Sequence, residues 1–136
     1  MLCKSAKIDL MEKNERLKRC RDLLLKLHKS MVDLERSLYE GIHGELTAGQ
    51  FLNLLLENDD FAWLRRFSLL IVEIDELFDQ KDGIAEEDID AAQAKVAELV
   101  RMDGGDDYFE DKYKYALQHS VEAASLQSEL RSLTGD

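Results

Sequence analysis

Six side chains of this sequence have the types and the spacing of a polar cluster that could do chemistry. They comprise a histidine, two carboxylic acids, a tyrosine, an arginine and a serine, namely His28, Glu35, Tyr39, Arg65, Ser68 and Asp75. At about 100° per residue, Glu35 falls within roughly 20° of Leu24 on the apolar stripe of a helix, where a carboxylate needs a partner. Because a desolvated carboxylate near a histidine favours shifted pKa values, the cluster is a candidate ligand-binding or acid–base site.

Two antiparallel helices would bring this cluster together. If the helices that carry Glu35 and Arg65 pack antiparallel across a short connecting helix, residue 39 lies near residue 61 and Glu35 lies beside Arg65. The same pairing has a purely structural explanation, because a buried ion pair can fix the register of two helices. We favour the structural explanation, since neither a glycine-rich loop nor a serine nucleophile elbow accompanies the cluster. No catalytic residue is therefore assigned.

Metal ligands with suitable spacing are scarce. Di-iron helical bundles use a Glu-x-x-His pair on each of two helices, and here only Glu40 and His43 have that spacing, at a broken helix end. The acidic segment 79–88 is similar to a calcium loop, but once its glycine takes the sixth position, Phe78 is first and Ile89 is twelfth. Neither of these side chains can bind calcium. The sequence predicts no metal site and no cofactor.

The elements that must position the polar residues are helices. Apolar side chains recur at alternating steps of three and four over most of the chain, and no alternating strand pattern is present. The spacing predicts helices over about residues 6–40, 51–56, 61–78, 85–102 and 107–133. We expect one all-α domain spanning residues 1–136, an up-and-down bundle of four long helices plus one short helix.

Local patterns mark two of the helix starts. Thr47 and Gln50 have the spacing of a capping box, and Asn58 can cap the helix that begins near residue 61. This third helix is apolar nearly all round, because Leu69 and Val72 lie opposite its main apolar stripe. We therefore expect it to run through the middle of the domain.

Composition and charge exclude several classes of protein. Of the 136 residues, 45% are hydrophobic and 35% are charged, and none is proline, which excludes collagen-like, proline-rich and generally disordered chains. The formal net charge of -11 opposes binding to nucleic acid or to an anionic membrane surface. We therefore expect neither nucleic acid nor a membrane as a partner.

The charge is unevenly distributed along the chain. Residues 1–40 have a net charge of +3, whereas residues 41–136 have a net charge of -14. Five basic residues of the first helix could form an anion-binding patch: Lys13, Arg16, Lys18, Arg19 and Arg21. They surround the helix, and no aromatic residues lie between them to stack on bases, so we expect them to be neutralised within the molecule.

Cysteine usage and the first residues predict a cytoplasmic protein. Cys3 and Cys20 lack the spacing of a zinc site and are too few for a disulfide scaffold, so we expect two reduced thiols. The N-terminal residues lack the apolar run of a signal peptide. The longest aliphatic run, residues 69–72, is too short to span a membrane.

Two features of the sequence are typical of association surfaces. A heptad-like apolar seam follows the first helix from Leu10 to Leu38, and an aromatic group that includes Tyr108 and Tyr113 opens the last helix. We expect the seam to be used mainly within the bundle itself. The sequence thus predicts a non-enzymatic acidic interaction protein, adaptor-like or chaperone-like, with a protein partner or self-association. The alternative is a small-ligand-binding or enzymatic bundle that uses the Glu35 cluster.

Two segments of the chain resemble a group of small uncharacterised bacterial helical proteins. They are Leu27–Glu40 and Phe61–Glu76, and the resemblance spans about a third of the chain. It implies a bacterial cytoplasmic origin. It implies no activity, ligand or catalytic residue.

Overall fold

The structure is a computed structural model that describes residues 2–104 and 106–135, with side chains from residue 9 onward. Within these residues the chain forms α-helices, one short 3₁₀ helix and no strand, which confirms the all-α class. The elements in chain order are α1 (Leu2–His43), α2 (Ala48–Glu57), the 3₁₀ helix η1 (Asp59–Leu64), α3 (Arg65–Phe78), α4 (Glu86–Val100), α5 (Asp107–His119) and α6 (Val121–Leu133).

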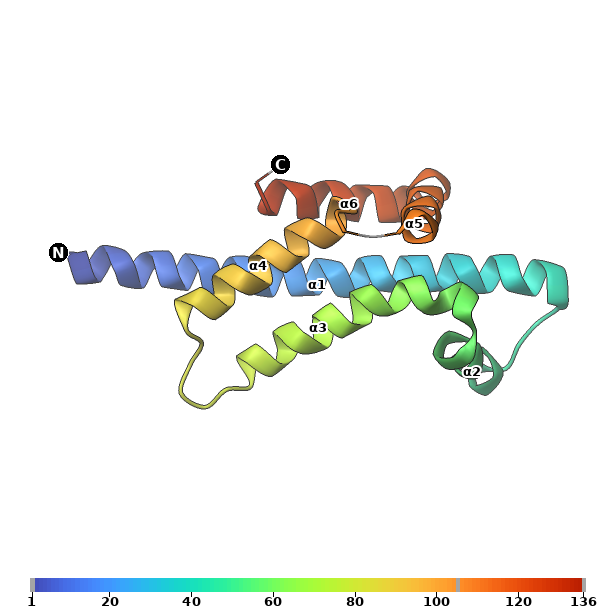
Figure 1. The fold of residues 1–136 in the computed structure, drawn as a ribbon, viewed down its shortest axis with the longest axis horizontal. Coiled ribbons are helices and arrows are strands. Elements are labelled where there is room, and N and C mark those ends of the chain that lie inside the picture. Colours follow the sequence, from blue (N-terminus) through green and yellow to red (C-terminus); the bar gives the residue numbers. More distant parts are fainter. Residues whose placement is uncertain (1, 105, 136) are drawn as a thin grey trace.

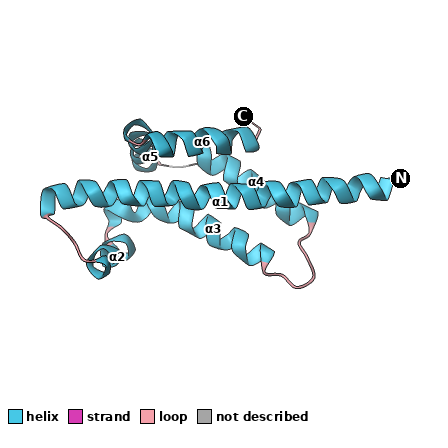
Figure 2. Cartoon of the chain, turned by 180° about the vertical axis from the view of Figure 1, so that it is seen from behind, coloured by secondary structure: helices cyan, strands magenta, loops and turns pink. Residues whose placement is uncertain are grey.

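The long helix α1 is the central element of the fold. Figure 1 shows α3 and α6 packed along α1, with α4 crossing it obliquely, and Figure 2 shows α1 in front when the molecule is seen from behind. Both α3 and α6 run antiparallel to α1, while α5 lies across the other helices and is seen almost end-on. The arrangement is therefore less regular than the up-and-down bundle expected from the sequence.

The expectation that the third helix runs through the middle is wrong. Leu69 and Val72 of α3 are 69% and 51% exposed. The helix with the most completely buried face is α1, whose core side chains are Leu17, Cys20, Leu23, Leu24, Leu27 and Met31. The reason is that α3 packs on α1, α4 and η1 with its other side chains, which leaves Leu69 and Val72 on its solvent side. The middle of the heptad-like seam is thus used inside the bundle, as expected.

The last predicted helix is in fact two helices that meet at Ser120. The backbone of Ser120 is extended, and its hydroxyl accepts a hydrogen bond from the Ala123 amide at 3.1 Å. A serine in this role satisfies an amide that the first turn of a helix leaves free, so it starts α6 where α5 ends. The apolar spacing continues across the break, which is why the sequence pattern does not show it.

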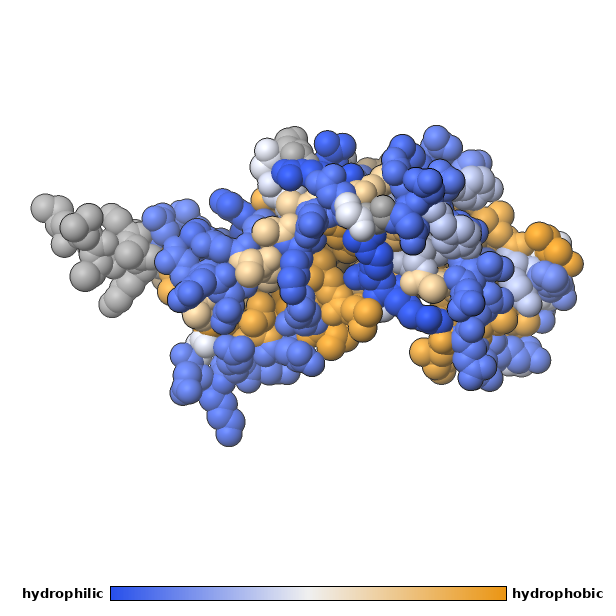
Figure 3. Space-filling model, in the orientation of Figure 1, coloured by the Kyte–Doolittle hydropathy of each residue, from blue (hydrophilic) through white to orange (hydrophobic). Residues whose placement is uncertain are grey.

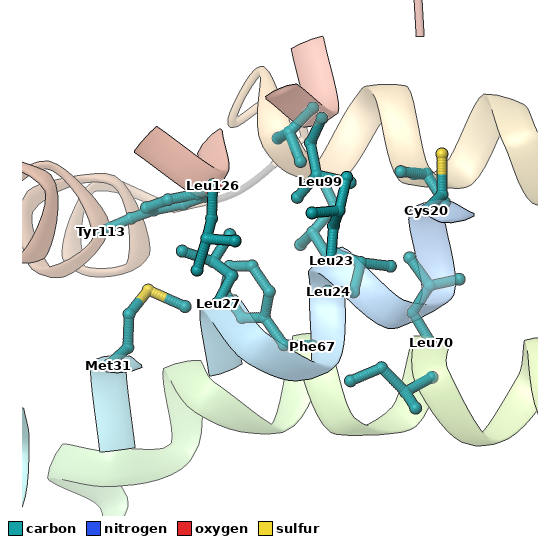
Figure 4. Close-up of a cluster of buried hydrophobic side chains, with 14 of the residues drawn as sticks. Cys20, Leu23, Leu24, Leu27, Met31, Phe67, Leu70, Leu99, Tyr113 and Leu126 are labelled. Carbon is teal, nitrogen blue, oxygen red and sulfur yellow. The ribbon is translucent and has the colours of Figure 1, made fainter. Parts of the chain in front are cut away.

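Side chains from α1, η1, α3, α4, α5 and α6 share one hydrophobic core. Figure 4 shows Leu27 of α1 beside Phe67 of α3 and Leu23 of α1 beside Leu99 of α4, with Tyr113 and Leu126 approaching from α5 and α6. Aromatic rings form the end of the core nearest α5, with centroid separations of 5.1–6.3 Å; these rings belong to Trp63, Phe67, Phe109 and Tyr113. This packing fixes η1 and α5 against the C-terminal half of α1.

The basic side chains of α1 are largely neutralised inside the molecule, as predicted. Lys13 binds Glu86 and Asp90 of α4, Lys18 binds Glu15, Arg19 binds Glu129 of α6, and Arg21 binds Asp75 of α3. The pair of Lys18 and Glu15 lies within α1, and the others join α1 to α3, α4 and α6 across exposed or half-buried surface, where each pair contributes little to stability.

Over residues 2–104 and 106–135, no helix is both long enough and apolar enough to cross a membrane.

Of the two helix starts predicted from local patterns, the capping box is confirmed, whereas Asn58 caps the 3₁₀ helix η1 and the α-helix α3 begins only at Arg65, without a side-chain cap. The Thr47 hydroxyl accepts from the Gln50 amide at 3.1 Å, and the Gln50 side chain accepts from the Thr47 amide at 2.9 Å, which completes a capping box at the start of α2. The Asn58 side chain accepts from the Asp60 amide and so caps η1. These contacts hold α2 as a separate short helix that packs mainly on η1.

Candidate functional site

The six residues of the predicted polar cluster lie in three separate places. They are Glu35 and Tyr39 in a cavity at the C-terminal end of α1, His28, Arg65 and Ser68 in a groove between α1, α2 and α3, and Asp75 in an ion pair with Arg21. No single cavity in the part of the chain that the structure describes holds them all. The cluster as a whole is therefore not a site, and the two cavities are separate candidates.

The predicted ion pair between Glu35 and Arg65 is not formed. Glu35 pairs instead with Lys112 of α5, whose ammonium nitrogen lies 3.5 Å from a carboxylate oxygen of Glu35. Arg65 donates to the carbonyl oxygen of Leu55 at 3.0 Å and to that of Leu56. These carbonyls lie at the C-terminal end of α2, where carbonyl groups lack partners within the helix and attract a cation.

The antiparallel register that suggested this pair is nevertheless correct. The rings of Tyr39 and Phe61 are 6.0 Å apart, and Arg21 of α1 donates to Asp75 of α3 at 2.7 Å. Backbone register alone therefore places Glu35 near residue 65. The side chain of Arg65 leaves this interface because α2 offers it two carbonyl oxygens.

The cavity at the C-terminal end of α1 is bounded by α1, η1 and α5. It has a volume of about 250 Å³, and its wall consists of Glu35, Leu38, Tyr39, Ile42, His43, Asp60, Phe61 and Lys112. Glu35 is only 5% exposed. The ring of Tyr39 packs at a tilt on that of His43 with a centroid separation of 4.2 Å, and the Tyr108 hydroxyl donates to the Asp60 carbonyl oxygen at 2.8 Å. This cavity thus combines a buried carboxyl group with aromatic walls.

Burial controls the protonation of Glu35. Removal from water raises the pKa of this carboxyl above its ordinary value, and the opposing effect of the Lys112 ammonium only partly offsets it. The carboxylate of Asp60 adds a smaller upward effect. Burial, together with Asp60 and Glu35, likewise raises the pKa of the Tyr108 hydroxyl. The site therefore favours a proton on Glu35 more than water does.

We predict that Glu35→Gln changes the pH dependence of stability. Folding raises the pKa of Glu35. Its contribution to the free energy of unfolding is therefore fully present below the pKa of the unfolded state, about 4.3, and is lost as the pH rises through the pKa of the folded state. The wild-type free energy of unfolding should thus fall relative to that of Glu35→Gln as the pH rises above about 4.3. Urea titrations across this range measure the difference. The exposed Glu57→Gln serves as the control, and equal profiles for both variants would contradict the burial of Glu35.

The second cavity is an apolar groove of about 400 Å³ between α1, α2 and α3, which we call the leucine groove. Its lining residues are His28, Leu52, Leu55, Leu56, Phe61, Leu64, Arg65, Ser68 and Leu69. Figure 3 shows hydrophobic side chains of α3 and of α2 on the two sides of a notch at the lower edge of the molecule. Leu52, Leu56 and Leu69 expose 55%, 62% and 69% of their surface. The groove therefore presents apolar surface to solvent along two helices.

Two polar residues of the leucine groove are hydrogen-bonded within the protein. Arg65 is bound to the α2 carbonyls, and the Ser68 hydroxyl donates to the Arg65 carbonyl oxygen at 3.2 Å. Burial lowers the pKa of His28, so its imidazole is neutral at neutral pH. The apolar walls of the groove are suited to binding.

Arg65 fixes the position of α2 and thus the width of the groove. We predict that Arg65→Ala weakens the attachment of α2 by about 1–2 kcal/mol, because two charge-assisted hydrogen bonds at a helix C-terminus are lost, one partly buried and one exposed. Since α2 is peripheral, global unfolding should change less than its local opening. Amide hydrogen exchange of Leu54 and Asn58 would measure this opening. Unchanged exchange in Arg65→Ala would contradict the role of Arg65.

Several residues of these two cavities were not found by sequence reasoning. The important ones are Lys112, which pairs with Glu35, and the groove residues Leu52, Leu56 and Leu69. No local pattern in the sequence connects Lys112 with Glu35, because their contact depends on the direction of α5, which ends at the break at Ser120 and lies across the other helices. The exposed leucines of α2 could have been predicted from the sequence. Leu52 and Leu56 lie four residues apart and thus share a face, and Phe51, the buried residue of this helix, lies on a different face.

No group of three or more histidine, cysteine, aspartate or glutamate side chains within the described part of the chain is arranged to hold a metal ion.

Comparison with known proteins does not identify a relative: no family model matches the chain, and neither a curated protein nor a solved structure matches it significantly.

Proposed function

We propose that this chain is a non-enzymatic helical interaction protein and that the leucine groove binds a protein partner. The observation that carries the proposal is the exposure of Leu52, Leu56 and Leu69 around one concave apolar site. Leucines scattered singly over a surface need no explanation, but leucines that flank a groove mark a protein-binding site. The free, buried thiol of Cys20 supports the expected cytoplasmic location.

The architecture around the groove also supports binding. The Arg65 hydrogen bonds connect α2 to α3, and the Arg36 guanidinium of α1 lies 5.2 Å from the centre of the Phe51 ring of α2, while the capping box fixes the first turn of α2. Arg36 further donates to the Leu46 carbonyl oxygen at 2.9 Å. A groove that is formed before binding needs little ordering on association, which favours affinity.

Site-specific photo-crosslinking in the native host tests this proposal. A photoreactive residue at position 52 should crosslink to a defined protein, whereas one at Val121, which is 90% exposed on α6, should not. The double substitution Leu56→Gln and Leu69→Gln should abolish the crosslink at position 52. The matched double substitution Met11→Gln and Val121→Gln removes exposed apolar surface elsewhere and should leave it intact. Equal crosslinking at both positions, or insensitivity to the groove substitutions, would refute the proposal.

The Glu35 cavity supports a second candidate function, the binding of a small molecule. The specific observation is a carboxyl group that is 5% exposed, has a raised pKa and lines a cavity with aromatic walls. Cavities for drug-sized ligands are commonly about 300–1,000 Å³, so one of about 250 Å³ suits only a very small ligand. A compound that raises the melting temperature of the wild type and of the groove variant, but not of Glu35→Gln, would favour this function.

A further inference from the structure

This inference rests on the second candidate function, the binding of a small molecule in the Glu35 cavity, and concerns the chemical class of that molecule. We infer that the cavity binds a small protonated amine, whose ammonium group pairs with the Glu35 carboxylate. The inference follows from the open acceptor positions of Glu35, from the charges on the cavity wall and from the aromatic rings beside them.

Glu35 has few partners for a buried carboxylate. The residue is 5% exposed, and its one polar contact among the described residues is the ion pair with Lys112 at 3.5 Å. A carboxylate can accept about four hydrogen bonds, and buried acceptors in proteins are normally satisfied. Glu35 also lines the cavity. A molecule in the cavity that donates hydrogen bonds would therefore fill acceptor positions that the protein leaves open.

The side chain of Lys112 shows how this site holds an ammonium group. Its nitrogen lies 3.5 Å from a Glu35 oxygen and 5.8 Å from the centre of the Tyr108 ring, so a carboxylate and an aromatic ring attract it together. A charge-assisted hydrogen bond from nitrogen to a carboxylate is commonly about 2.7–2.9 Å long. The Lys112 ammonium is thus too distant to satisfy Glu35, and an amine in the cavity can approach the carboxylate more closely.

The charges on the cavity wall favour a cation over an anion. Glu35 and Asp60 place two carboxylates on the wall, and Lys112 places one ammonium group there. The formal net charge of -11 of the whole chain also attracts cations and repels anions. An inorganic cation fits less well, because no group of three or more metal-binding side chains among the described residues could hold it. An organic cation needs no such set of ligands.

Aromatic rings on the wall can pack on the hydrocarbon part of an amine. The centre of the Tyr39 ring lies 4.2 Å from that of His43 and 6.0 Å from that of Phe61, and all three residues line the cavity. Aromatic rings bury alkyl groups and attract cations within about 6 Å of their centres. Because the volume of the cavity is about 250 Å³, the amine must be small.

Three probes of nearly equal shape test the charge of the ligand. They are tert-butylammonium, tert-butanol and trimethylacetate, a cation, a neutral molecule and an anion. NMR titrations of the full chain measure the dissociation constants from the Leu38 methyl signals, at about pH 8, where carboxyl groups are ionised and alkylammonium groups are protonated. The cation should bind at least fivefold more tightly than the alcohol, and the anion should not bind. Equal binding of cation and alcohol, or tighter binding of the anion, would overturn the inference.

Substitutions at Glu35 and Lys112 test the assigned partner of the ammonium group. Glu35→Gln should weaken binding of tert-butylammonium at least tenfold, whereas the exposed Glu57→Gln should change it less than twofold. Lys112→Gln should strengthen binding at least twofold, because the ammonium group that competes for Glu35 is removed. Melting curves verify that each variant is folded. Weaker binding to Lys112→Gln, or equal binding by the Glu35 and Glu57 variants, would contradict the assignment.

Failure of the inference can be distinguished from failure of the function on which it rests. A neutral or anionic compound that raises the melting temperature of the wild type, but not of Glu35→Gln, would overturn the inference and leave the second candidate function standing. If the stabilisation by every compound, amines included, were independent of Glu35, both would fail.

Discussion

Replacing Phe67 by alanine should lower the free energy of unfolding by about 3–5 kcal/mol. Phe67 is completely buried, and its ring centroid lies 5.1 Å from that of Tyr113 and 5.9 Å from that of Phe109. The substitution removes a ring that connects α3 to α5 and leaves a cavity that rigid neighbours cannot fill. Since small domains have a total stability of about 5–15 kcal/mol, the variant should retain only part of its stability or unfold.

Leu69→Ala provides the matched control for Phe67→Ala. Leu69 lies on the same helix, but 69% of its surface is exposed, so its truncation should change stability by less than about 0.5 kcal/mol. Urea-induced unfolding followed by circular dichroism measures both variants. Similar losses in the free energy of unfolding for the two variants would contradict the aromatic packing between α3 and α5.

Tyr113→Phe should lower the free energy of unfolding by about 1–3 kcal/mol, although only one oxygen atom is removed. The Tyr113 hydroxyl donates to the side-chain oxygen of Gln127, whose amide group in turn donates to the Val100 carbonyl oxygen at 2.6 Å. Tyr113 and Gln127 are both buried. Without the hydroxyl, the Gln127 oxygen remains buried and unpaired, and an unsatisfied buried acceptor is costly.

The control for the hydroxyl group is Tyr115→Phe on the same helix. Tyr115 is 39% exposed, and its ring stacks on His119 with a centroid separation of 3.9 Å, which phenylalanine preserves. Its stability should change by less than about 0.5 kcal/mol. Equal losses for Tyr113→Phe and Tyr115→Phe would show that the network of Tyr113, Gln127 and Val100 contributes nothing.

The features that sequence reasoning predicted correctly depend on local physics. The capping box at Thr47 and Gln50 uses groups three residues apart, and the buried face of α1 follows from a simple helical period. The break at Ser120 was missed because the helical period survives it: Ala116 and Ala123 are seven residues apart and both are buried. The period is the same on either side, and only the cap marks the change of direction.

The candidate site was predicted in part, and the errors have physical causes. The antiparallel register of α1 and α3 was predicted correctly. It places the segment of α1 that holds Glu35 and Tyr39 opposite the residues near 61. The predicted partner of Arg65 was wrong because an arginine side chain is long and binds the acceptors within its reach. The unpaired carbonyl oxygens at the end of α2 are within reach and take the place of the expected carboxylate. The leucine groove depends on how three helices diverge in space, which no helical period describes.

The measurement that tests the account most directly is methyl-resolved NMR of leucine-labelled protein during titration with the protein that crosslinks at position 52. Binding in the leucine groove predicts that the methyl signals of Leu52, Leu55, Leu56 and Leu69 shift together and saturate. The signals of Leu38 at the Glu35 cavity and of Leu17 in the core should stay in place. Shifts confined to Leu38, or small shifts spread evenly over all leucines, would contradict the claim that this groove is the binding site of the protein.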